Sequence, residues 1–109
     1  MAKTDALQGS LDLLVLKILS RRAPLHGYGI MTAIEEISGD ALRVEEGSIY
    51  PALHRMEEAG FVRAKWIEKS NGRRARSYEM TARGRKQLTS EEARWTAVTS
   101  AVQRVLKLA

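Results

Sequence analysis

The first stripe of apolar residues predicts a helix that is buried on more than one side. It follows the helical spacing i, i+3, i+4, i+7 and i+8, at Leu11, Leu14, Val15, Ile18 and Leu19. Leu13 and Leu16 lie off this face, so neighbouring elements must cover two sides of the helix. We expect Ser10 to be the N-cap, and Pro24 prevents the helix from continuing beyond Arg22.

A second helix is predicted after the segment Gly27-Tyr28-Gly29, and Gly39 is expected just past its end. Its inward positions are Ile30, Ala33, Ile34 and Ile37. The Gly-Tyr-Gly segment is shorter than a dinucleotide fingerprint and follows no predicted strand, so we expect no nucleotide site there. Tyr28 has two open roles: packing beneath the third helix with its hydroxyl bonded internally, which we favour, or contacting a phosphate.

The third helix is predicted from Ser48, its expected N-cap, to Gly60, with Pro51 in the first turn. At 100° per residue, the inward positions are Ile49, Ala52, Leu53, Met56 and Ala59. The outward positions are Tyr50, Pro51, His54, Arg55 and Glu58. The outer face therefore presents hydrogen-bond donors near its N-terminal end.

A β-hairpin follows. Residues 61–68 alternate in polarity, Ser70-Asn71-Gly72 is a turn signal, and residues 74–81 form the return strand. Trp66 is expected to pack within the hairpin. The tip carries Lys69, Arg73 and Arg74.

The C-terminal segment predicts a long helix that begins after Thr81. Leu88, Trp95 and Val102 recur every seven residues, and Val98 and Val105 occupy the companion position, which is a short heptad pattern. Thr89 and Glu92 could instead form a capping box and break the helix near Leu88. We favour one continuous helix, which is longer than the core of so small a domain requires.

Composition narrows the function classes. The 109 residues are enough for one domain and include no cysteine, which excludes a disulfide framework or a thiol nucleophile. His26, expected in a turn, and His54 are too few to form a metal shell, so no metal or cofactor is expected. Met1 to Asp5 shows no signal peptide and no apolar run could span a bilayer, so we expect a cytoplasmic protein without membrane contact.

Charge is concentrated in one part of the chain. The net charge is +5, yet residues 61–86 carry +7 while residues 1–60 carry −3. This basic stretch includes the predicted hairpin tip. Three helices followed by a hairpin with a basic tip form a winged helix-turn-helix, in which the third helix enters the DNA major groove. The fold expected is therefore mainly α with a small β-hairpin: a winged-helix DNA-binding domain at residues 5–80 and a C-terminal dimerisation helix at residues 81–108.

Four stretches together resemble the PadR family of transcriptional regulators. They begin at Gly9 (GSLDLLVL), Pro24 (PLHGYGI), Gly47 (GSIYPALHRME) and Arg76 (RSYEMTARG), and the resemblance covers residues 7–88. It implies a homodimeric winged-helix protein, usually a repressor, whose short form has a single C-terminal dimerisation helix. It places Ser48, Tyr50, Pro51 and Arg55 in the recognition segment and residues 71–74 at the wing tip. The residues assigned to the DNA interface are Tyr28, Ser48, Tyr50, Pro51, His54, Arg55, Asn71, Gly72, Arg73, Arg74 and Arg76.

The expected partners are double-stranded DNA, a second copy of the chain and a small aromatic effector. The dimer interface is assigned to Leu13, Leu16, Leu88, Trp95, Val98, Val102 and Val105. Some short members of the family bind aromatic drugs with a tryptophan of the C-terminal helix, so the resemblance suggests an effector pocket at Trp95. A simple core role at the interface is the alternative for Trp95.

The function predicted is a sequence-specific DNA-binding regulator, a homodimeric repressor of a palindromic operator. The alternative is a winged-helix protein-interaction module, against which the basic wing argues. No nucleophile–base pair, paired carboxylates or phosphate loop is present in the sequence, so we do not expect an enzyme.

Overall fold

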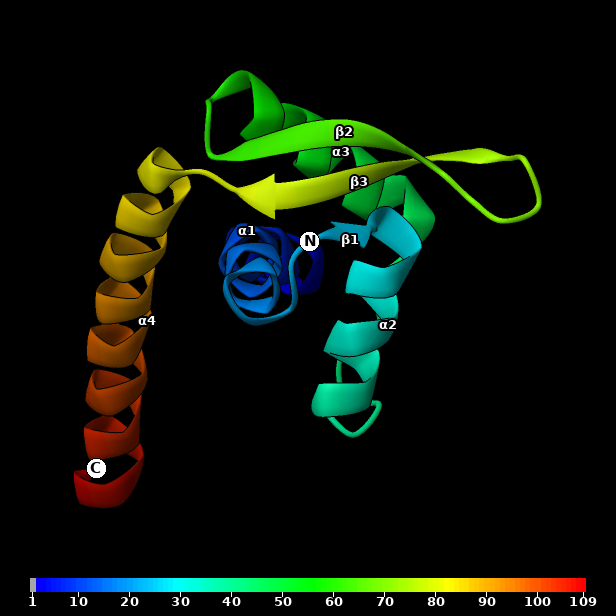
Figure 1. Ribbon diagram of the computed structural model, residues 1–109. Helices are drawn as coiled ribbons and strands as arrows, with labels where there is room; N and C mark the ends of the chain where they lie inside the picture. Colours follow the sequence, from blue (N-terminus) through cyan, green and yellow to red (C-terminus); the bar gives the residue numbers. More distant parts are fainter. Residues whose placement is uncertain (1) are drawn as a thin grey trace.

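The structure is a computed structural model that describes the backbone of residues 2–109 and the side chains of residues 10–109. Helix α1 (Ala2–Arg22) lies at its centre. It contacts α2 (Gly27–Ile37), α3 (Glu46–Glu58), strand β3 (Arg74–Met80) and α4 (Ala82–Leu108) (Figure 1). The expectation that this helix is covered on more than one side is therefore confirmed.

The start of α1 differs from the sequence prediction. The helix begins at Ala2, so Ser10 lies inside it and is not its N-cap. Ala6, Leu7 and Gln8 are good helix formers, and nothing in this stretch forces a start at Ser10. The predicted C-terminal end at Arg22 is correct.

The core joins all the helices to the sheet. Its fully buried members include Leu11, Val15 and Leu16 from α1, Ile30 from α2, and Ile49, Leu53 and Met56 from α3. The predicted division of α3 into an inner and an outer face is thus correct. The N-cap of α3 is Glu45, three residues before the predicted Ser48, so Pro51 lies in the second turn of the helix and cannot donate to the carbonyl of Gly47.

Two helices end as the sequence predicts. Gly39 and Gly60 both have positive φ, at 64° and 82°. After α3, the amide of Phe61 donates to the Met56 carbonyl and that of Gly60 donates to the Glu57 carbonyl, which is the Schellman arrangement. This end turns the chain sharply into the first strand of the wing.

The wing belongs to a three-stranded antiparallel sheet with the order β1-β3-β2. Strand β2 (Val62–Glu68) pairs with β3 along its whole length, from Val62 opposite Met80 to Glu68 opposite Arg74. The predicted hairpin is confirmed. Strand β1 (Leu25–His26) was not predicted, because a strand of two residues has no detectable alternation, and it immediately precedes Gly27.

Helix α4 is continuous over 27 residues and projects from the sheet away from the body of the domain (Figure 1). The Thr81 hydroxyl accepts a hydrogen bond from the Gly84 amide at 3.0 Å, which confirms the predicted N-cap. Thr89 lies within the helix and its hydroxyl donates to the Arg85 carbonyl, so the alternative break near Leu88 is excluded. None of the helices, over the residues described, is long and apolar enough to cross a membrane.

Candidate nucleic-acid interface

The outer face of α3 presents the side chains that the sequence assigns to DNA. Tyr50, Pro51, His54 and Arg55 are all exposed, and Ser48 is partly exposed at the start of the helix. His54 lies 3.5 Å from the Glu58 carboxylate one turn later. The face is therefore open to a ligand.

Arg55 is held by a long-range ion pair that the sequence did not indicate. Its guanidinium Nη2 donates to Asp12 Oδ1 of α1 at 2.9 Å. Desolvation by burial raises the pKa of Asp12, and this effect outweighs the opposing attraction of Arg55. A phosphate that binds Arg55 must therefore compete with, or add to, a carboxylate already in place.

The tip of the wing is a tight turn exposed to solvent. Gly72 has a φ of 82°, a left-handed conformation that suits glycine. The Asn71 side-chain oxygen accepts from the Arg73 amide at 3.0 Å. Asn71 and Gly72 thus have a structural role in the turn, while Arg73 is exposed at the tip.

Further along the wing, Trp66 lies on the surface and is 58% exposed. The prediction that it packs within the hairpin is wrong, because this part of the wing extends beyond the helices that would cover it. The guanidinium carbons of Arg74 and Arg76 lie 5.2 and 5.8 Å from its ring centroid, within cation–π distance. Arg76 also donates to Glu57 Oε2 of α3 at 2.8 Å, so it links the wing to this helix.

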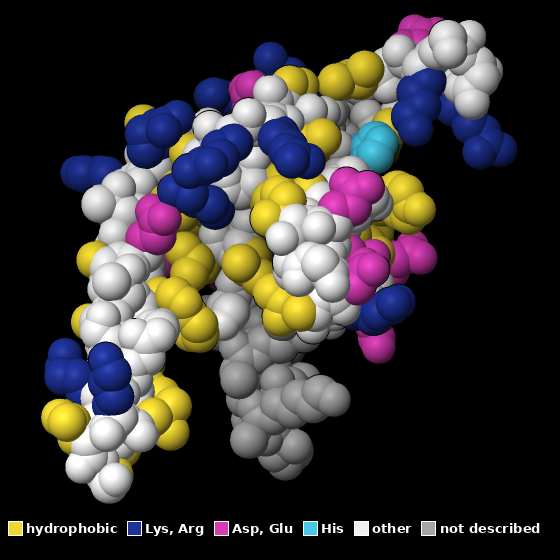
Figure 2. Space-filling view, turned by 90° about the horizontal axis from the view of Figure 1, so that it is seen from below, with side chains coloured by type: hydrophobic (Ala, Val, Ile, Leu, Met, Phe, Trp, Pro, Cys, Tyr) yellow, Lys and Arg dark blue, Asp and Glu magenta, His cyan; other side chains and the backbone are white. Residues whose placement is uncertain are grey.

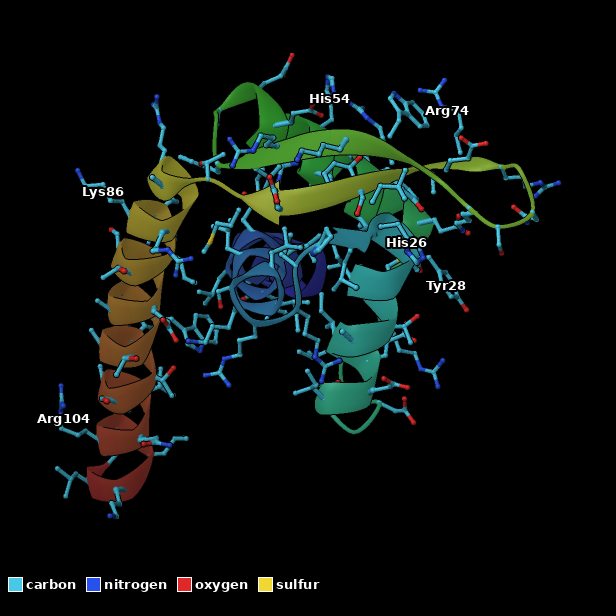
Figure 3. All side chains as sticks on the ribbon, viewed as in Figure 1. His26, Tyr28, His54, Arg74, Lys86 and Arg104 are labelled. Carbon is cyan, nitrogen blue, oxygen red and sulfur yellow. The ribbon has the colours of Figure 1, made fainter. Side chains whose placement is uncertain are left out.

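Tyr28 is 65% exposed at the start of α2, so the favoured reading, burial beneath the third helix, is wrong. Helix α2 begins at Gly27, earlier than expected, and this places Tyr28 in its first, solvent-exposed turn. Figure 3 shows Tyr28 beside His26 at the end of α2 nearest the wing. The His26 Nδ1 accepts from the Gly29 amide at 2.9 Å, so His26 is the N-cap of α2.

Tyr28, Tyr50 and Arg76 meet at one open depression, together with His26 and Lys69. Lys69 was noted only as a charge at the wing tip. Its place beside the two tyrosines depends on how the wing folds over α2, which no local pattern reveals. Tyr78, in strand β3, is buried, and desolvation raises the pKa of its hydroxyl.

The residues assigned to the dimer interface divide into two groups. Leu13, Leu16 and Leu88, which the sequence assigned to the dimer interface, are buried in the core of the single chain and are not exposed to a second copy. The multiple contacts of α1 use these side chains internally. By contrast, the remaining four side chains lie on α4 and are half or more exposed: Trp95, Val98, Val102 and Val105. Figure 2 shows hydrophobic side chains at the surface along this helix (left).

Among residues 10–109, no group of three His, Asp or Glu side chains could hold a metal ion. What the described surface offers is a donor-rich helix face, a basic wing and an apolar helix. This arrangement defines a winged-helix protein of the DNA-binding class.

The comparisons with known proteins give the family. Residues 15–90 match the model of the transcriptional regulator PadR-like family, and the chain belongs to this family. Its members are transcriptional regulators that bind DNA, not enzymes. The resemblance based on the four sequence stretches is therefore confirmed.

Solved structures show the same fold. A PadR-like transcriptional regulator from Bacillus cereus is 28% identical, with a TM-score of 0.81 over 96% of this chain and 99% of that one. A PadR family regulator from Eggerthella lenta is 25% identical, with a TM-score of 0.81 over 99% of this chain and 92% of that one. A transcriptional regulator from Clostridium thermocellum has a TM-score of 0.84 at 22% identity, covering 92% and 96%.

Proposed function

We propose that this PadR-family regulator is a homodimeric repressor that binds a palindromic operator. The observation that carries the dimer is the exposed apolar stripe of α4. Trp95 is 52% exposed in the single chain, and Val98, Val102 and Val105 continue its stripe along the helix. These positions share one helix face, and a second copy of the same stripe would remove it from water.

A dimer gives the DNA contacts their specificity. One winged helix reads a single half-site, whereas two related by a two-fold axis read half-sites about 34 Å apart on successive major grooves. In this proposal Ser48, Tyr50, Pro51, His54 and Arg55 face the groove. The wing residues Asn71, Gly72, Arg73 and Arg74 reach the flanking backbone, and Arg76 braces the wing against Glu57.

Repression follows from occupancy alone. A bound dimer that covers a promoter excludes other proteins from the same DNA, and this requires no further contact surface. Activation would require an additional surface for a second protein. In the proposed dimer, α3 and the wing are assigned to DNA and α4 to the second copy, and repression needs no surface beyond these.

The electrostatic part of the proposal is tested at the wing tip. The double variant Arg73→Ala, Arg74→Ala should weaken binding to every duplex and flatten the dependence of affinity on salt, because phosphate contacts carry no sequence information. Arg55→Ala should instead reduce the preference for the operator over random DNA. An unchanged salt slope in the double wing variant would refute the assignment and favour the protein-interaction alternative.

The dimer is tested by sedimentation of the full chain. A two-fold dimer is expected at micromolar concentration, and Val98→Asp, Val102→Asp should yield monomers because charges would enter the apolar interface. A wild-type chain that sediments as a monomer would refute the dimer.

We also propose that Trp95 contributes to a pocket for a small aromatic effector at the dimer interface. Two rings related by the two-fold axis could hold a planar aromatic guest in an offset stack. The effector acts only if it prefers one arrangement of the two α4 helices over the other. Planar aromatics titrated into a Trp66→Phe variant should quench Trp95 and lower operator affinity. If neither signal changes, Trp95 is a core residue of the interface alone.

A further inference from the structure

The depression between α2, α3 and the wing has a composition suited to one kind of ligand. It has a volume of about 380 Å³ and is lined by residues of all three elements, among them Tyr28, Tyr50, Lys69 and Arg76. Among the side chains described, those of residues 10–109, no carboxylate lines it. Figure 3 shows two of its lining residues, His26 and Tyr28, at the end of α2 nearest the wing.

The position of Tyr50 is built into the fold by a glycine. A Cβ atom at Gly27 would lie 2.6 Å from Tyr50 Cε1 and 2.9 Å from its Cζ. The ring therefore rests directly on the backbone at the start of α2, a place that only glycine leaves open. This contact holds the tyrosine hydroxyl at the depression.

Tyr28 is positioned by the same segment. His26 caps α2 through its Nδ1, and its ring lies 6.4 Å from the Tyr28 ring, tilted by 49°. The two tyrosines thus reach the depression from different helices, and Gly27 and His26 order both.

Two basic residues of the interface are already paired with carboxylates. Arg55 pairs with Asp12, and Arg76, which also lines the depression, pairs with Glu57. By contrast, the Tyr28 and Tyr50 hydroxyls and the Lys69 ammonium have no hydrogen bond or ion pair with the side chains and backbone described for residues 10–109. An ammonium can only donate, so a ligand that spans the three groups must supply acceptors and negative charge.

We propose that this depression binds one phosphodiester group of the DNA backbone, with Lys69 as the cation and the Tyr28 and Tyr50 hydroxyls as hydrogen-bond donors. The inference rests on the proposed DNA-binding function. It adds a contact on α2 to those of α3 and of the wing tip, and it assigns the Tyr50 hydroxyl of α3 to the DNA backbone at the edge of the groove rather than to a base. Such a contact positions the protein on the duplex without reading sequence.

The test removes each tyrosine hydroxyl while keeping its ring, in Tyr28→Phe and Tyr50→Phe, and removes the positive charge of Lys69 in Lys69→Gln. The probe is a fluorescent duplex selected from random sequences on the purified protein. Each tyrosine variant should bind at least about tenfold more weakly, as expected for losing a hydrogen bond to a charged group. Lys69→Gln should also reduce the salt slope by about 1. Lys86→Gln, on the side of the molecule that faces away from the wing (Figure 3), is the matched control and should change neither quantity.

A second measurement identifies the phosphate. Duplexes that carry a single neutral methylphosphonate linkage are scanned along the bound site. At one linkage in each half-site, replacing the charged phosphate by the methylphosphonate should lower the DNA affinity of the wild type. The same replacement should have little further effect on the affinity of Lys69→Gln. If every linkage weakens both proteins by the same factor, or if both tyrosine variants bind like the wild type, the inference is wrong. If the wild-type protein binds no duplex, or binds with an affinity that does not depend on salt, the proposed DNA-binding function itself is refuted.

Discussion

Gly84, in the first turn of α4, lies where the helix meets the start of the wing. A Cβ atom there would lie 2.1 Å from the carbonyl oxygen of Phe61 and 2.9 Å from Met80 Cγ. Non-bonded carbon and oxygen atoms normally approach no closer than about 3.3 Å, so Gly84→Ala requires a shift of about 1 Å. The neighbour is backbone and cannot rotate away.

The size of the effect follows from what that shift would disturb. Overpacking of this kind costs about 1–3 kcal/mol. The Phe61 carbonyl also accepts from the Thr81 amide at 3.0 Å, so the N-cap of α4 is strained as well, for about a further 1 kcal/mol. The better helix propensity of alanine offsets about 1 kcal/mol. We therefore expect a net loss of about 1–3 kcal/mol, or a fall in Tm on the order of 10 °C.

The matched control is Gly47→Ala in α3, because no atom of the described residues lies within 4 Å of a Cβ there. This variant should gain up to about 0.5–1 kcal/mol, so the same substitution should have opposite signs in two helices. Urea unfolding followed by helical circular dichroism measures both, at one protein concentration because a dimer's stability depends on it. A Gly84→Ala variant that unfolds at the same urea concentration as the wild type would refute the reasoning.

Three further predictions concern single features. Because burial raises the pKa of Asp12 above 3.8, its contribution to the free energy of unfolding should fall as pH rises through that raised pKa. Asp12→Asn should remove this fall in urea titrations between about pH 3 and 6, and identical profiles would count against it. A chain that ends at Leu88 should sediment as a monomer or be insoluble, whereas a soluble dimer would contradict the role of α4. Trp66→Leu should weaken duplex binding about two- to fivefold, through loss of its stacking with Arg74, and Trp66→Phe should largely restore it, as measured by anisotropy of a labelled duplex.

Local features of the fold were predictable because their causes lie within a few residues. Thr81 caps α4 through the amide three positions later, and Gly60 ends α3 through bonds that span at most five positions. The apolar period of α3 likewise assigned its inner and outer faces correctly. Such features need no knowledge of the tertiary structure.

Contacts between distant segments were not predictable for the opposite reason. Asp12 and Arg55 are 43 positions apart, and nothing near either residue indicates the pair. Strand β1 has two residues and exists only because β3 lies beside it. Trp66 has the pattern of a packed residue, but its exposure depends on how far the wing extends beyond the helices.

Which apolar residues of α4 belong to the core of the domain and which lie exposed on its surface was only partly predictable. The heptad pattern treats Leu88 and Trp95 alike, because they lie one heptad apart. In the fold, Leu88 still lies over α1, whereas Trp95 lies beyond the contacts that bury the first part of α4. Periodicity identifies an apolar face, but the length over which the domain covers it follows from the packing of α1 against α4.

The junction at Thr81 explains how a dimer helix can control the position of the wing. The Thr81 hydroxyl donates to the Gly60 carbonyl at 2.6 Å and accepts from the Gly84 amide, so the end of α3 and the start of α4 are joined through one side chain. Gly84 lets the helix lie directly against the Phe61 backbone at the start of β2. A junction without an intervening side chain has little room to bend. In the proposed dimer, the angle between the two α4 helices would therefore set the spacing of the two wings, and a ligand that changed that angle would change the fit to a palindrome of fixed spacing.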